Sequence, residues 1–87
     1  MKIKDGFLVK NASGSKIIVP ICNPNFDAIM TVNETGEFIF NLLNERECSV
    51  DEVVSAILEI YAAPESLVRT DVENFVAALK KANLLVD

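Results

Sequence analysis

The sequence contains no histidine, and this absence removes the commonest arrangements of catalytic side chains. Serine and cysteine nucleophiles usually depend on a neighbouring histidine base, so Ser-His and Cys-His chemistry is excluded. The two cysteines, Cys22 and Cys48, are far apart and lack the further ligands at close spacing that a zinc site needs. We therefore expect no metal and no cofactor, and we interpret the cysteines as small, partly buried thiols rather than as a disulfide.

Glycine and tyrosine are scarce as well. The three glycines are widely scattered, so they form neither a phosphate-binding loop nor a dinucleotide fingerprint. The sole tyrosine, Tyr61, lies on an apolar stripe of helical spacing and is expected in the core. Carboxylate pairs such as Asp51 and Glu52 fall at an expected helix start, where capping explains them without acid–base chemistry. These observations predict that the protein is not an enzyme.

Long hydrophobic runs are absent too. The longest clean apolar stretch, residues 17–22, has the length of a strand and is far shorter than the ~18–20 residues of a membrane span. Residues 1–6 reach charge and glycine before any apolar run develops, so no signal peptide is expected. A chain of 87 residues is one domain's worth. We expect a single domain over residues 1–87 that is cytoplasmic and has no membrane partner.

Basic side chains are outnumbered by acidic ones. The chain has 8 Lys and Arg against 13 Asp and Glu, which gives a formal net charge of −5. An acidic domain is repelled by a phosphate backbone, so nucleic acid is not an expected partner. The acidic surface suits solubility and a partner that carries basic residues.

The first third of the sequence predicts three short strands. Residues 6–10 form the first, and the β-branched segment 16–22, apolar on both faces, is expected to be central. Residues 28–32 form the third. Between the first two strands, Gly14 belongs to a turn cluster and can adopt a positive φ. Residues 23–25 form a second turn.

The rest of the sequence predicts three helices. Asn33 is a good N-cap for the first helix, whose apolar residues repeat at helical spacing. Ser49 and Glu52 form a capping box that opens the second helix. Pro64 is placed as the first residue of the third helix, and Asn83 can end it in the left-handed conformation. Three strands followed by three helices predict an α+β, winged-helix-like domain with a small three-stranded antiparallel sheet.

Two features of this predicted fold are suited to binding another polypeptide. The third strand is short and apolar, and as a sheet edge it would offer unpaired backbone groups to a strand from another chain. The last helix has an apolar surface wide enough to face the core and still line a groove. That surface comprises Val68, Val72, Phe75, Val76, Ala77, Ala78, Leu79 and Ala82.

Residues 32–43, with the sequence VNETGEFIFNLL, resemble the PqqD-like family of peptide chaperones, named for the D protein of pyrroloquinoline-quinone biosynthesis. The Asn-x-Thr-Gly segment that opens the first helix is the recurrent mark of that family. The resemblance continues through residues 49–54, residues 71–79 and the Leu-Leu pair at residues 84–85, and so covers essentially the whole chain. Its motifs are caps and apolar spacings, and it is their order and separation that make them specific.

The resemblance implies a function and a site. Such domains bind the leader segment of a ribosomally synthesised precursor peptide between the third strand and the third helix, extending the sheet. They present it to a modifying enzyme, often a radical S-adenosylmethionine (radical SAM) enzyme. Within that region we expect the strand and one flank of the helix to contact the peptide, with Arg69 and Lys80 pairing with acidic leader residues. The expected peptide-binding residues are Ile29, Met30, Thr31, Arg69, Val72, Glu73, Val76 and Lys80.

Three alternatives remain open at this point. A winged-helix DNA-binding regulator would share the architecture, although the last helix carries as many acidic as basic side chains. A subunit-assembly module would dock on an enzyme without any leader peptide. An exposed strand edge can also pair with a second copy of the chain, so a homodimer is a further alternative.

Overall fold

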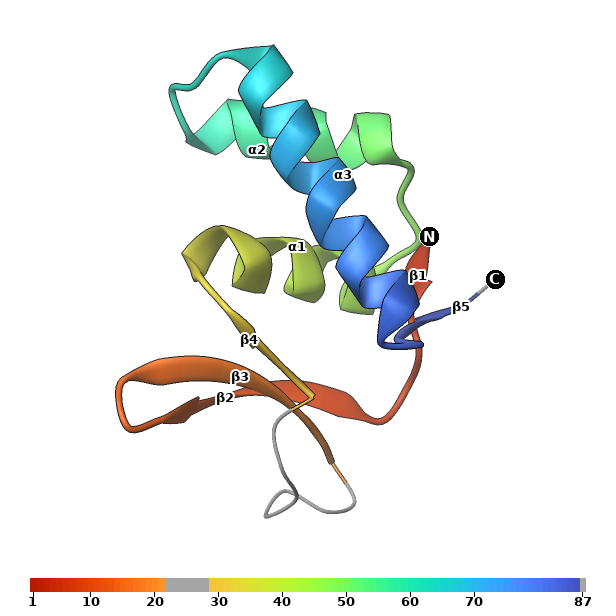
Figure 1. The fold of residues 1–87 in the computed structure, drawn as a ribbon. Helices are drawn as coiled ribbons and strands as arrows, with labels where there is room; N and C mark the ends of the chain where they lie inside the picture. The colour runs from red at the N-terminus through yellow and green to blue at the C-terminus, as the bar shows by residue number, and fades with distance from the viewer. Residues whose placement is uncertain (22–28, 87) are drawn as a thin grey trace.

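The protein is a three-stranded antiparallel sheet followed by three helices, which confirms the α+β, winged-helix-like fold expected from the sequence (Figure 1). The structure is a computed structural model, and it describes residues 1–21 and 29–86. The strand order is β2–β3–β4, so the strand expected to be central does lie in the middle. The elements of this part are β2 (Phe7–Ala12), β3 (Ser15–Pro20), β4 (Met30–Val32), α1 (Glu34–Glu45), α2 (Val50–Ile60) and α3 (Glu65–Lys81).

A two-residue turn joins β2 to β3 and fixes their register. Ala12 pairs with Ser15, and the intervening Ser13 and Gly14 both have positive φ, at 51° and 82°. Two successive residues with positive φ are typical of the turn that matches the twist of a hairpin. The predicted role of Gly14 is therefore confirmed. The second expected turn, at residues 23–25, and the start of the third expected strand lie outside the described residues.

A second, two-stranded sheet was not expected from the sequence. β1 (Lys2–Ile3) pairs antiparallel with β5 (Leu85–Val86), and the Lys4 amide donates to the Leu84 carbonyl at 2.8 Å. The Cys48 amide donates to the Met1 carbonyl at 2.9 Å, which also joins this segment to the connection between α1 and α2. Figure 1 shows β1 and β5 side by side at the end of α3.

Side-chain caps define where the first two helices begin. The Asn33 side chain accepts a hydrogen bond from the Gly36 amide at 2.8 Å. Ser49 and Glu52 form both bonds of the capping box, at 3.0 and 3.1 Å, so both predicted caps are confirmed. The bond from the Ser49 amide lowers the pKa of the Glu52 carboxyl below its ordinary value of 4.5. α3 begins at Glu65, one residue later than expected, with Pro64 as its N-cap.

The core lies where α1 meets the sheet on one side and the other two helices on the other (Figure 1). Phe40 is its largest fully buried side chain, and the Cys48 thiol is free and buried. Cys22 lies outside the described residues. None of the described helices is long and apolar enough to cross a membrane. The buried cluster comprises Ile3, Ile18, Val32, Ile39, Phe40, Leu43, Cys48, Val53, Val54, Ile57, Val68, Val72, Val76, Leu79, Leu84 and Leu85.

Tyr61 corrects one expectation. The sequence placed its ring in the core, but its side chain is exposed, with 40% of the residue accessible to solvent. The reason is that α2 ends at Ile60 and Tyr61 has an extended backbone, with φ −113° and ψ 134°. Tyr61 therefore leaves the helical stripe to which its spacing assigned it.

Candidate functional site

β4 is an edge strand of the three-stranded sheet. It pairs with β3 in the register Ile18↔Met30, Ile17↔Thr31 and Lys16↔Val32, and no other strand of the described chain pairs with it. Successive backbone groups of a strand point to opposite sides, so one set of β4 amides and carbonyls faces away from β3. Such an edge is a template for the addition of another strand.

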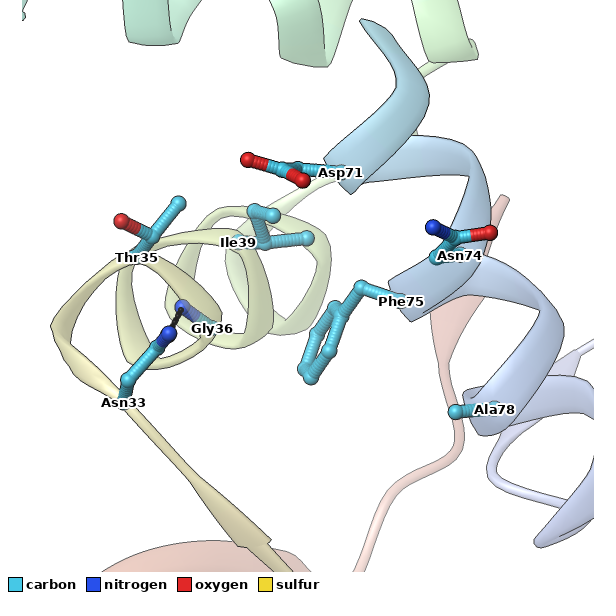
Figure 2. Close-up of a pocket in the computed structure, with 8 residues that line it drawn as sticks. All are labelled: Asn33, Thr35, Gly36, Ile39, Asp71, Asn74, Phe75 and Ala78. Carbon is cyan, nitrogen blue, oxygen red and sulfur yellow. Dashed lines mark hydrogen bonds between the residues drawn. The ribbon is translucent and has the colours of Figure 1, made fainter. Parts of the chain in front are cut away.

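A cleft of about 380 Å³ opens between the start of α1 and the middle of α3, directly after β4 (Figure 2). Figure 2 shows the Phe75 ring extending from α3 toward Gly36, and the Asp71 carboxylate extending toward α1 above it. We call this space the α1–α3 cleft. It is lined by Asn33, Thr35, Gly36 and Ile39 from the α1 side and by Asp71, Asn74, Phe75 and Ala78 from α3.

Gly36 makes the close approach of Phe75 to α1 feasible. A Cβ atom on Gly36 would lie 3.1 Å from Cε1 of Phe75 and 3.1 Å from Cβ of Val32, closer than such atoms normally pack. A glycine inside a helix costs about 1 kcal/mol relative to alanine. The Asn-x-Thr-Gly segment therefore has a physical explanation here, because Asn33 caps α1 while Gly36 leaves room for the ring.

A second cleft, of about 290 Å³, lies beside the turn between α2 and α3. We call it the turn cleft. It is mostly apolar, and two of its lining residues are unusually exposed for their type, Tyr61 at 40% and Leu67 at 55%. Thr35 and Asp71 line both clefts, so the two spaces adjoin each other at these residues. The remaining lining residues of the turn cleft are Ile57, Ala62, Ala63 and Val68.

The expected binding residues of the third strand lie at the sheet edge. Ile29 and Met30 are half-buried and pack against the core, while Thr31 is exposed. The Ile29 amide donates to the Ile18 carbonyl at 2.9 Å, which extends the pairing with β3 by one residue beyond β4.

The expected binding residues of α3 do not lie on one exposed flank. Val72 and Val76 are core residues, with 0% and 6% of their surface accessible, while Glu73 and Lys80 are exposed. Arg69 Nη1 lies 2.7 Å from Asp51 Oδ1, and this hydrogen bond raises the pKa of the guanidinium. None of these five side chains lines either cleft. Peptide contact by the eight expected residues stays a prediction.

Sequence reasoning placed Phe75 and Ala78 on the apolar surface that could line a groove, but it named neither as a peptide-binding residue and did not single out Asp71 or Asn74. Asp71, Asn74, Phe75 and Ala78 follow one another at steps of three, one and three, which places them on one face of a helix. That spacing was available in the sequence. The mixed polarity of the face concealed it, because Phe75 and Ala78 belong to the apolar surface of the helix whereas Asp71 and Asn74 are polar.

The described residues offer little else that is chemically reactive. Among residues 1–21 and 29–86 no group of three or more His, Cys, Asp or Glu side chains is placed to hold a metal ion. Both clefts lack a basic side chain, so neither has the electrostatic character of a phosphate-binding surface.

Comparisons with known proteins show a matching family and a solved structure of the same fold. The family model of coenzyme PQQ synthesis protein D (PqqD) matches residues 21–85. A solved structure described as TbiB1 in complex with the TbiA(beta) leader peptide superposes with a TM-score of 0.69 at 23% sequence identity, and the match covers 100% of both chains. At this identity, the likeness establishes the fold. No curated protein matches the sequence.

Proposed function

The chain belongs to the PqqD family, and from this premise we propose that it binds the leader segment of a ribosomally synthesised precursor peptide. The TbiB1 structure, which has the same fold, contains a leader peptide. The observation that carries the proposal is the position of the β4 edge, whose strand leads straight into the α1–α3 cleft. A backbone template and a side-chain cleft are thus available to one extended peptide.

In the proposed mode of binding, the leader adds as a fourth strand beside β4. An added strand would lie about 4.8 Å from β4 and would pair with its outward backbone groups, which gives affinity with little dependence on sequence. Alternate side chains of that strand would face α3 and enter the cleft beside Phe75. Selectivity would come from these side chains, because the backbone pairing is the same for any sequence.

The proposed contacts keep the residues expected from the sequence and add the cleft. Ile29, Met30 and Thr31 would supply the strand edge. Asp71 and Phe75 would contact leader side chains directly. The five α3 residues expected from the sequence would contribute in two ways. Val72 and Val76 would support Phe75 from the core against which it packs. Arg69, Glu73 and Lys80 would contact the peptide at the surface.

We propose a non-catalytic role in which the domain presents the bound leader to a modifying enzyme. The family resemblance is the basis for naming a radical SAM enzyme as that partner. The DNA-binding alternative gains no support, because the net charge is −5 and both clefts lack basic side chains.

A pair of proline variants tests whether the leader adds to the strand. Of Met30 and Thr31, one amide faces β3 and the other faces the open edge, because the amides alternate. Met30→Pro and Thr31→Pro should therefore differ: one weakens the sheet, and the other stays folded but loses binding. Binding is measured by the fluorescence anisotropy of a labelled precursor leader peptide. Full affinity in both variants, each shown to be folded, would exclude strand addition.

A further inference from the structure

Among the described residues, Asp71 is the single charged residue that lines the α1–α3 cleft or the turn cleft. It lines both of them, so it lies where the α1–α3 cleft and the turn cleft adjoin. Figure 2 shows its carboxylate extending from α3 toward the start of α1. Any extended peptide that occupies both clefts would have to pass Asp71.

The charge of Asp71 is not balanced by a neighbouring cation among the described residues. The ion pairs of this part of the chain use Lys16, Arg46 and Arg69, and none of them involves Asp71. Arg69, two positions away on α3, is held 2.7 Å from Asp51 and 3.9 Å from Glu65.

The start of α1 does not neutralise this carboxylate either. A helix N-terminus carries a partial positive charge of roughly half a unit. In α1, however, the first turn contains two acidic residues, Glu34 and Glu37, and only Glu37 is paired, with Lys16 at 3.0 Å. The junction of the clefts is therefore a negative site within an acidic domain.

The surroundings of Asp71 are apolar on both sides. The α1–α3 cleft offers Phe75 and Ile39, and the turn cleft offers the exposed side chains of Leu67 and Tyr61. In an extended peptide, side chains two positions apart point the same way and lie about 6.5–7 Å apart. If a lysine or arginine of the bound peptide lies beside Asp71, the peptide residues two positions before and after it would therefore lie near the α1–α3 cleft or the turn cleft.

We propose that Asp71 is a specificity-determining residue that selects leader peptides carrying a lysine or arginine with an apolar residue two positions away. This inference rests on the proposed function, since it names the class of leader that the same site accepts. The leader is thus expected to contain a basic residue in addition to the acidic residues expected to pair with Arg69 and Lys80. Any acidic residues that pair with Arg69 or Lys80 would lie elsewhere along the peptide, because those two side chains line neither cleft.

Selection from random peptides displayed on phage tests this preference without knowledge of the natural precursor. The targets are the wild-type protein, Asp71→Asn, Asp71→Lys and the control Glu59→Gln, which removes the same charge from an exposed position of α2 outside both clefts. Wild type and Glu59→Gln should enrich Lys or Arg with an apolar residue two positions away. Asp71→Asn should lose the basic preference, and Asp71→Lys should enrich Asp or Glu there instead.

The affinity of one selected peptide for wild type and for Asp71→Asn measures how much the ion pair with Asp71 contributes to binding. A single exposed ion pair contributes modestly, so Asp71→Asn should weaken that peptide about two- to fivefold, and replacement of the peptide's lysine by norleucine should remove the difference between the proteins. Because Asp71 is exposed, the variants should give folded spectra.

The outcomes separate this inference from the function on which it rests. The proposed role of Asp71 is wrong if the peptides enriched by wild type show no preference for Lys or Arg, or if Asp71→Asn keeps that preference. Leader binding still stands in either case, provided that the enriched peptides shift the NMR signals of the β4 amides. If wild type enriches no peptide at all, both proposals are overturned.

Discussion

Gly36 and Phe75 come into contact across the α1–α3 cleft so closely that a Cβ on Gly36 would lie 3.1 Å from the ring. Gly36 lies in the first turn of the first helix, and Phe75 lies in the middle of the last helix. Their contact brings the two walls of the candidate site together at the end of β4 (Figure 2). The geometry of the site therefore depends on this pair.

Gly36→Ala should destabilise the protein slightly and weaken peptide binding. Alanine would favour the helix by about 1 kcal/mol, but the added methyl would crowd Phe75 and Val32 at a cost of about 1–3 kcal/mol. The half-buried ring can yield, whereas Val32 is fixed in β4, so we expect a net loss of about 1 kcal/mol in the free energy of unfolding. Urea unfolding measures it. If Gly36→Ala is more stable than wild type and binds normally, the contact does not constrain the site.

A double-mutant cycle separates the two contacts that a methyl at position 36 would make, one with the Phe75 ring and one with Val32 of β4. In a Phe75→Leu background, Gly36→Ala should cost less than it does in wild type, because the smaller side chain leaves room for the methyl. Equal costs in the two backgrounds would assign the crowding to Val32 alone.

Phe75→Ala should impair binding more than folding. Fully buried phenylalanines cost about 3–5 kcal/mol when truncated, and because Phe75 is only half-buried we expect about 1–2 kcal/mol here. An aromatic anchor at the centre of a peptide site should change the dissociation constant at least about tenfold. The matched control is Ile60→Ala, since Ile60 is 61% exposed and lines neither cleft. A similar loss of affinity in both variants would show that Phe75 has no special role.

The capping box of α2 should make stability depend on pH. The folded pKa of Glu52 is lowered, so its contribution is fully present above the ordinary pKa of 4.5 and is lost as the pH falls through the lowered value. Glutamine can also accept the bond from the Ser49 amide but does not titrate. Urea midpoints at about pH 7 and about pH 3 should therefore fall more for wild type than for Glu52→Gln. Equal falls would mean that this carboxyl does not link folding to pH.

The elements that the sequence predicted correctly are those specified by nearby residues. The capping box at Ser49 and the turn at Gly14 each need only a few neighbours, so their sequence patterns predict them directly. β1 and β5 could not be predicted in this way, because two-residue strands have no periodicity and their pairing joins opposite ends of the sequence. Tyr61 was misplaced because nothing in the apolar spacing marks the end of α2 at Ile60.

The candidate site was predicted less completely than the fold. The apolar surface of α3 is wide, so the sequence alone did not decide which side faces the core. The structure buries Val72 and Val76 and leaves Phe75 at the cleft. The importance of Gly36 likewise depends on a ring that is distant in sequence and comes near only after α3 has packed.

The most direct test of the central claim is the behaviour of the β4 amides in a titration with leader peptide. Nitrogen-15 spectra of the protein would be recorded up to saturation, together with the hydrogen exchange rates of residues 29–32. Strand addition predicts that the outward amide or amides of β4 shift and exchange more slowly, while the Phe75 amide shifts with the same dissociation constant. A saturable complex in which the β4 amides neither shift nor gain protection would contradict the account.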